Sequence, residues 1–146
     1  MDFIKRLFGS KELIKTYPNW DDTRISGLNL KEEEFDKFEE IKTAQFQFNH
    51  QHQLGGFPNM QQRPEMYNEC QLVSNGIYCG DPSGYKDPRA PDLLKTADDW
   101  ILLLQIDSDD DTGMMWGDGR MLYFWIKKED LKNKAFNKTW MILQCG

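Results

Sequence analysis

The segment from Trp100 to Trp125 constrains the possible fold more than any other part of the chain. It opens with residues 101–106, which are almost all apolar and therefore indicate a central strand. A second apolar run, at residues 121–126, indicates a neighbouring strand. The connection between the two runs holds five aspartates, namely Asp107, Asp109, Asp110, Asp111 and Asp118. The sequence therefore predicts two buried strands joined by an acidic turn, where a cation or a basic partner would be held.

The composition limits the class of protein. At 146 residues the chain fits one domain, which buries roughly 68–70% of the surface of its unfolded chain. The net charge of −6 argues against a nucleic-acid partner, because phosphate binding needs clustered Lys and Arg. The longest apolar run is far shorter than the roughly 20 residues of a membrane span, and no secretory cleavage site follows the first apolar residues. The cysteines, Cys70, Cys79 and Cys145, have no metal-site spacing and indicate reduced thiols. We therefore expect a cytoplasmic protein that does not bind nucleic acid and is not stably inserted in a membrane.

The chain divides into an amphipathic N-terminal segment at residues 1–15 and one domain at residues 16–146. Asn29 suits the N-cap of an acidic amphipathic helix. Asn75 and Gly76 suit either the end of a helix or the turn of a hairpin. The predicted elements are a helix at 30–44, a loop at 46–64, a helix at 64–75, a helical turn at 92–96, strands at 100–106, 121–126 and 139–145, and a short helix at 128–131. Helices followed by three strands indicate a single compact α+β domain, with a mostly antiparallel sheet and two or three helices.

The acidic turn partly matches a calcium-binding loop. Asp107, Asp109 and Asp111 occupy ligand positions one, three and five of such a loop, and Asp118 occupies position twelve. Two features depart from the pattern, because Gly113 falls at position seven instead of six and an aspartate replaces the usual longer glutamate. The flanks are also strands, whereas calcium loops of this kind lie between helices. A solvated acidic loop and a surface for a basic protein partner are the alternatives, and Asp110 belongs to that surface.

A second candidate site lies around a glycine-rich turn. The turn consists of Gly55, Gly56, Phe57 and Pro58, and aromatic residues such as Trp116 crowd the strands and the acidic loop. Together they predict a groove for a small ligand or a peptide, although aromatic residues at these positions also suit a core.

No catalytic constellation is found in the sequence. His50 and His52, with Cys70 and Cys79, supply the residue types of a zinc site or of a cysteine hydrolase, but their spacing supports neither. The glycine pair lacks the Lys-Ser/Thr of a P-loop and the spacing of a dinucleotide fingerprint. We therefore predict no enzyme activity and no cofactor, apart from a possible calcium ion.

Several short motifs resemble the YwqG family, also called DUF1963. The motifs, in chain order, are 53–58 with Gln61 or Gln62, 69–72, 100–111, 114–118, 122–126, 129–131 and 143–145. The resemblance implies an α+β fold without an established activity, so no catalytic residue is carried over. Members are associated with bacterial toxin–immunity neighbourhoods, which makes a toxin-binding role a hypothesis.

The chain resembles only the C-terminal half of longer family members. If the two halves of those proteins pack together, a single half would expose an edge strand or an apolar face. This predicts self-association or a protein partner. The main hypothesis is therefore a non-enzymatic protein-binding module, with a calcium-binding domain, a small-ligand-binding protein or a hydrolase as alternatives.

Overall fold

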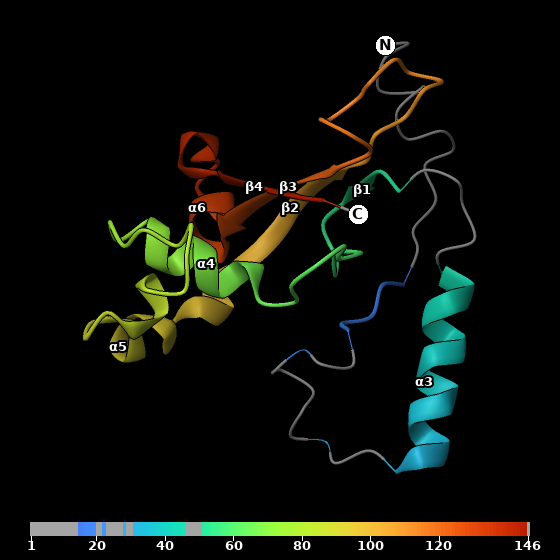
Figure 1. Cartoon of the computed structure of the whole chain (residues 1–146), viewed down its shortest axis with the longest axis horizontal. Coiled ribbons are helices and arrows are strands. Elements are labelled where there is room, and N and C mark those ends of the chain that lie inside the picture. Colours follow the sequence, from blue (N-terminus) through green and yellow to red (C-terminus); the bar gives the residue numbers. More distant parts are fainter. Residues whose placement is uncertain (1–14, 20–21, 23–27, 29–30, 46–50, 146) are drawn as a thin grey trace.

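The computed structural model describes residues 15–19, 22, 28, 31–45 and 51–145 (Figure 1). Its helices are α3 (Glu32–Gln45), α4 (Met66–Val73), α5 (Ala90–Leu94) and α6 (Lys128–Lys132), and its short 3-10 turns are η1 (Gly84–Lys86), η2 (Ala97–Asp99) and η3 (Phe136–Lys138). Its strands are β1 (Gln53–Leu54), β2 (Trp100–Ile106), β3 (Met121–Lys127) and β4 (Trp140–Gln144). Of the predicted N-terminal segment, residues 1–14 lie outside the described residues.

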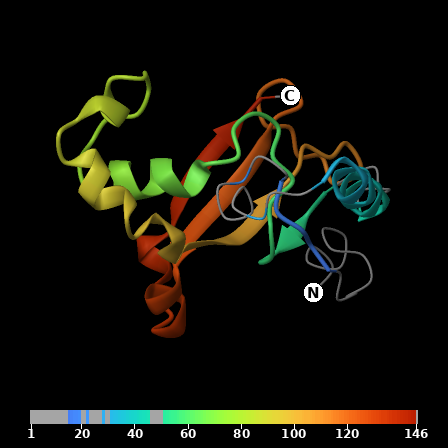
Figure 2. The ribbon, with the colours of Figure 1, turned by 90° about the horizontal axis from the view of Figure 1, so that it is seen from below.

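The strands form one antiparallel sheet of 4 strands in the order β1-β2-β3-β4. Figures 1 and 2 show α4 and α5 near one end of this sheet and α3 standing apart from it. The predicted α+β fold with a mostly antiparallel sheet is therefore confirmed. The short helices α5 and α6, of 5 residues each, lie at or beside the predicted helical turn at 92–96 and short helix at 128–131.

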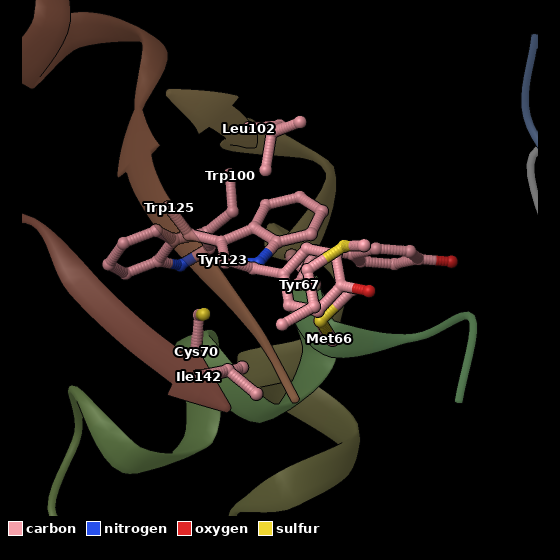
Figure 3. Packing of buried hydrophobic residues seen from close by; sticks show 10 residues of the cluster. Met66, Tyr67, Cys70, Trp100, Leu102, Tyr123, Trp125 and Ile142 are labelled. Carbon is pink, nitrogen blue, oxygen red and sulfur yellow. The ribbon is translucent and has the colours of Figure 1, made fainter. Parts of the chain in front are cut away.

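The main core lies between α4 and one face of the sheet (Figure 3). The rings of Tyr67 on α4 and Trp125 on β3 have centroids 6.4 Å apart and are tilted by 55°. Burial of each large apolar side chain stabilises the fold by roughly 1.5–3 kcal/mol. The buried members of the cluster are Met66, Tyr67, Cys70, Ala97, Trp100, Leu102, Met121, Tyr123, Trp125 and Ile142.

The opposite face of the sheet is also apolar. The strand register places Leu54, Leu104, Phe124 and Met141 in one row across the four strands. Of these side chains, Leu54 is 67% exposed and Met141 is 49% exposed. No described strand pairs with the outer side of β4. Among the described residues, β4 is therefore an edge strand, and this face of the sheet carries exposed apolar side chains.

The helix predictions agree with the structure except at their ends. The acidic helix at 30–44 is α3, and its proposed N-cap Asn29 lies outside the described residues. The helix at 64–75 is α4, so the alternative hairpin at Asn75 and Gly76 is wrong. Gly76 has φ +77°, and the Ile77 N–H donates to the carbonyl of Leu72 at 3.1 Å, which ends the helix in a left-handed turn.

The strand predictions are confirmed within a residue or so at each end. The prediction of an uninterrupted loop at 46–64 is wrong, because residues 53–54 form β1. A strand of 2 residues is too short to produce a visible alternation in the sequence, and only its pairing with β2 defines it. Within the described residues, no helix has the length and apolar character needed to cross a membrane.

Candidate binding groove

Buried glutamines hold the segment after β1 against the sheet. Gln53, Gln105 and Gln144 are only 8%, 0% and 4% exposed. Buried amides need hydrogen-bond partners, and these three find them in the backbone of the neighbouring segment. Gln144 accepts from the N–H groups of Gln61 and Gln62 at 3.0 and 3.1 Å and donates to the carbonyl of Arg63 at 3.1 Å. Glutamine side chains of the sheet therefore supply the hydrogen bonds that backbone groups would supply if this segment were a regular strand.

Gln105 fixes the middle of the same segment. Its Oε1 accepts from the N–H of Asn59 and its Nε2 donates to the carbonyl of Gln51, both at 2.8 Å. The Tyr123 hydroxyl donates to the carbonyl of Asn59 at 2.5 Å. Because burial raises the pKa of Tyr123, this hydroxyl keeps its proton. The segment is thus anchored at both polar groups of the Asn59 backbone.

The glycine-rich turn is shaped by its backbone. Gly55 and Gly56 have φ values of +67° and +74°, in the left-handed region that favours glycine. Gln53 Nε2 donates to the carbonyls of Gly55 and Phe57 at 2.7 and 2.8 Å. A Cβ on Gly56 would lie 2.4 Å from Oγ1 of Thr16, which accepts from the N–H of Phe57 at 2.8 Å. Gly56 is therefore required both by its conformation and by the close approach of residue 16.

This turn forms one wall of an open groove of about 790 Å³. The groove follows the start of β2, and side chains of β3 and α6 complete it. Its lining is mostly apolar and consists of Leu54, Gly55, Gly56, Phe57, Pro58, Asp98, Ile101, Leu102, Leu103, Trp125, Lys128 and Leu131. All four residues predicted from the glycine-rich turn, residues 55–58, therefore line one groove.

The lining of the groove includes two charged residues and one residue with a buried polar group. Asp98 and Lys128 are exposed, and they give the lining one charge of each sign. Trp125 is 1% exposed, and its indole N–H has no acceptor in the described part of the chain. A buried donor without an acceptor costs about 1–3 kcal/mol, so this indole is a destabilising polar group in the core beside the groove. A mostly apolar hollow with a few polar groups is typical of a binding site.

The acidic loop is organised by internal hydrogen bonds. Asp107 Oδ2 accepts from the N–H of Gln51 at 3.1 Å, and the Asp107 carbonyl accepts from Nε1 of Trp116 at 3.1 Å. Ser108 accepts from the N–H of Trp116 at 3.1 Å and donates to the carbonyl of Arg120 at 2.7 Å. Trp116, which was predicted as a binding residue, therefore closes this loop and does not line the groove.

Asp109 and His52 form a buried pair between the loop and the segment before β1. His52 Nδ1 accepts from the N–H of Asp107 at 3.2 Å, so its Nε2 carries the proton and donates to Asp109 Oδ2 at 3.1 Å. Each side chain is only 5% exposed. Burial opposes ionisation of Asp109, but hydrogen bonds from His52, from the Thr112 hydroxyl and from the N–H groups of Asp111 and Thr112 outweigh it and lower the pKa of Asp109 to about 2. The carboxylate is thus held in place as an internal acceptor.

The structure does not bring the four aspartates of the calcium pattern together as one ligand set. No group of three or more His, Cys, Asp or Glu side chains within the described residues is arranged to hold a metal ion. Asp107 and Asp109 accept internal hydrogen bonds, whereas Asp111 and Asp118 are exposed. Asp110, predicted to contact a partner, is exposed as well. Calcium binding by this loop stays a prediction, which a calcium titration would test.

The cysteines of the described residues are free thiols. Burial raises the pKa of Cys70 and of Cys79, so both favour the protonated form, which is a poor nucleophile. His52 is engaged by Asp107 and Asp109, and His50 lies outside the described residues. The geometry of the described residues therefore adds no support for the zinc site or the cysteine hydrolase that the sequence left as alternatives.

A smaller hollow of about 450 Å³ lies beside the start of α4. Burial raises the pKa of its Glu69, and the nearby Arg63 partly opposes this rise. Its lining residues are Arg63, Pro64, Glu65, Met66, Glu69 and Tyr85. The groove beside β2 is larger and more apolar, and we take it as the candidate site.

The sequence predicted the glycine-rich wall of the groove but not the rest of it. Ile101 and Leu103 were assigned to a buried strand and Leu131 to a short helix, because their apolar character alone does not show that one side stays open. The buried glutamines were also missed. Their signal was a polar amide inside an otherwise apolar strand, as at Gln105 and Gln144.

The fold and the groove define a small α+β domain with an antiparallel sheet and an open apolar site at one strand edge. A family model described as a domain of unknown function (DUF1963) matches residues 5–145, and the chain belongs to this family. The match begins well before the first of the motifs that carry the resemblance, at residues 53–58. None of the curated proteins compared with the chain matches it.

Proposed function

We propose that the chain is a protein-binding module and that the groove beside β2 is its binding site. The observation that carries this proposal is an apolar hollow of about 790 Å³ at a strand edge, bounded by a backbone turn that hydrogen bonds hold in place. A preformed apolar site with a few polar groups needs little reorganisation on binding. The internal use of Asp107 and Asp109 leaves the acidic loop as a weaker candidate for the main site.

The acidic loop supports a narrower form of the proposal, in which the partner is basic. Asp110 and Asp118 are exposed, and Figure 1 shows the loop between β2 and β3 extending beyond the sheet. Their carboxylates would attract a basic partner and accelerate its association in a salt-dependent way. A toxin bound by an immunity protein is one such partner. Replacing both aspartates with asparagine should reduce the salt dependence of the association rate, and an unchanged dependence would remove the loop from the contact.

Peptide display tests the groove directly. A random dodecapeptide library on phage is selected against the whole chain, against Leu54→Lys and against Met141→Lys. Leu54 lines the groove, and Met141 is its counterpart in the same register row at the other edge of the sheet. Both side chains are exposed, so neither change should prevent folding, and equal melting temperatures verify this.

We expect the wild type and Met141→Lys to enrich the same peptide consensus and Leu54→Lys to lose it. The proposal is overturned if no consensus emerges, or if Leu54→Lys enriches the same peptides as the wild type. A basic consensus that depends on Asp110 and Asp118 instead would move the site to the acidic loop.

A further inference from the structure

We infer that the groove takes an extended peptide segment, which pairs with the outer edge of β2 as an additional antiparallel strand. This inference rests on the proposed function and specifies the conformation and chemistry of the partner. It starts from an interruption in the sheet. β1 pairs with β2 only at Gln53 with Gln105 and at Leu54 with Leu104.

The edge of β2 is open where the groove lies. After Leu54, one more backbone bond joins the two segments, from the N–H of Gly55 to the carbonyl of Leu103 at 3.1 Å. No described strand pairs with the outer side of residues 100–102, although the inner side of the same residues pairs with β3. A strand edge of this kind presents unpaired backbone donors and acceptors to an incoming chain.

The turn after β1 keeps this edge open. The left-handed conformations of Gly55 and Gly56 direct the chain away from β2, and the hydrogen bond between Phe57 and Thr16 holds it there. A register irregularity in β2 between Leu102 and Leu104 adds to the interruption. The gap is thus produced by hydrogen-bonded backbone geometry, so it persists when no partner is bound.

The side chains around the edge suit alternating apolar residues. Successive side chains of an added strand would point to opposite faces of the sheet. On one face they would meet Leu102 and Trp125, which belong to the main core cluster. On the other face they would meet Ile101 and Leu131, the latter from α6.

The charges of the groove lie at one end. Asp98 precedes β2 and Lys128 follows β3, and the register places the ends of these two strands side by side through Trp100 and Lys127. The two charged lining residues are of opposite sign, in a chain whose net charge is −6. The fitting occupant is therefore an uncharged, apolar segment of a protein partner, extended and free of proline, with a polar residue permitted where it leaves the groove at this end.

N-methylation of the selected peptides tests the inference. A consensus peptide from the display experiment is synthesised with a fluorophore, and analogues are made with one methylated backbone nitrogen at each position in turn. Binding to the whole chain is measured by fluorescence anisotropy. Hydrogen exchange of the chain is followed with and without the parent peptide.

We expect a loss of tenfold or more in affinity at every second position of the peptide, because alternate N–H groups of an edge strand pair with the sheet. Backbone exchange at residues 100–102 should slow in the complex. Uniform tolerance of methylation, or losses that recur every three to four positions as in a helix, would overturn the inference while the proposed function stands. If no peptide depends on Leu54, the proposed function itself fails. If light scattering instead shows a dimer that Leu54→Lys dissolves, the occupant is a second copy and the inference is wrong.

Discussion

Replacing Gln105 with methionine tests whether glutamine side chains hold the wall of the groove in place. Methionine has a similar length and volume but cannot hydrogen-bond as an amide does. The change leaves the N–H of Asn59 and the carbonyl of Gln51 without the partners that Gln105 supplies at 2.8 Å each. The position is 0% exposed, so water cannot replace the lost partners without a rearrangement.

The expected loss follows from these two bonds. A buried polar group left unsatisfied costs about 1–3 kcal/mol, and the apolar side chain regains part of this by its own burial. We therefore expect Gln105→Met to lower the free energy of unfolding by roughly 2–4 kcal/mol, which corresponds to a fall in Tm of roughly 5–15 °C for a domain of this size. Chemical denaturation and calorimetry measure both quantities.

A local measurement separates this explanation from a general loss of packing. Hydrogen exchange at the Asn59 amide should accelerate more than exchange in the centre of β3. Gln62→Met serves as the matched control, because Gln62 is exposed and should change the free energy of unfolding by less than about 0.5 kcal/mol. The reasoning is refuted if Gln105→Met is as stable as the control and the Asn59 amide exchanges as in the wild type.

Four further tests follow. Gly55→Ala should cost roughly 1–2 kcal/mol for its positive φ, whereas Gly56→Ala should cost clearly more, because its Cβ would also lie 2.4 Å from Thr16; equal costs in urea denaturation would contradict this. The pKa of Asp109 is lowered to about 2, so its contribution to stability is present above the ordinary pKa of an aspartate, near 4, and is lost as the pH falls toward 2. Asp109→Asn should flatten the pH dependence of stability in that window, and an unchanged slope between pH 5 and 2 would show that other groups cause it. Replacing His52 with glutamine keeps a donor for Asp109 and should destabilise less than His52→Ala, as thermal melting would reveal. Calcium binding by the acidic loop competes with the hydrogen bonds that Asp109 accepts; a rise in Tm with calcium would support the predicted cation site, and an unchanged Tm would contradict it.

The elements with the clearest patterns were predicted almost residue for residue. β2 and β3 were recognised because long apolar runs bounded by turn residues have few other interpretations. β1 was missed, because 2 residues carry no periodic signal and gain their strand character only from pairing with Gln105 and Leu104. The hairpin alternative at residues 75–76 is wrong because the backbone there ends a helix. An Asn-Gly pair suits both structures, so the sequence alone does not distinguish them.

The candidate sites were likewise predicted in part and missed in part. The glycine-rich turn was identified from its composition, and it lines the groove. The acidic loop was identified by its charge, but the roles of its aspartates differ. Asp109 is held internally by His52 and backbone N–H groups, whereas Asp110 is exposed. Spacing along the chain does not separate these cases, because the partner of Asp109 lies 57 residues earlier in the sequence.

The sequence alone determined the fold class, the central strand pair and the positions where the chain turns, since these follow from local apolar patterns and backbone preferences. Only the tertiary structure decided which polar side chains are internal and which side of β2 stays open. Those features depend on contacts between residues far apart in the chain. In the described part of the chain no strand covers the edge beside residues 100–102, and the turn that leaves it depends on two glycines with positive φ and on a hydrogen bond to Thr16, which no local pattern in β2 reveals.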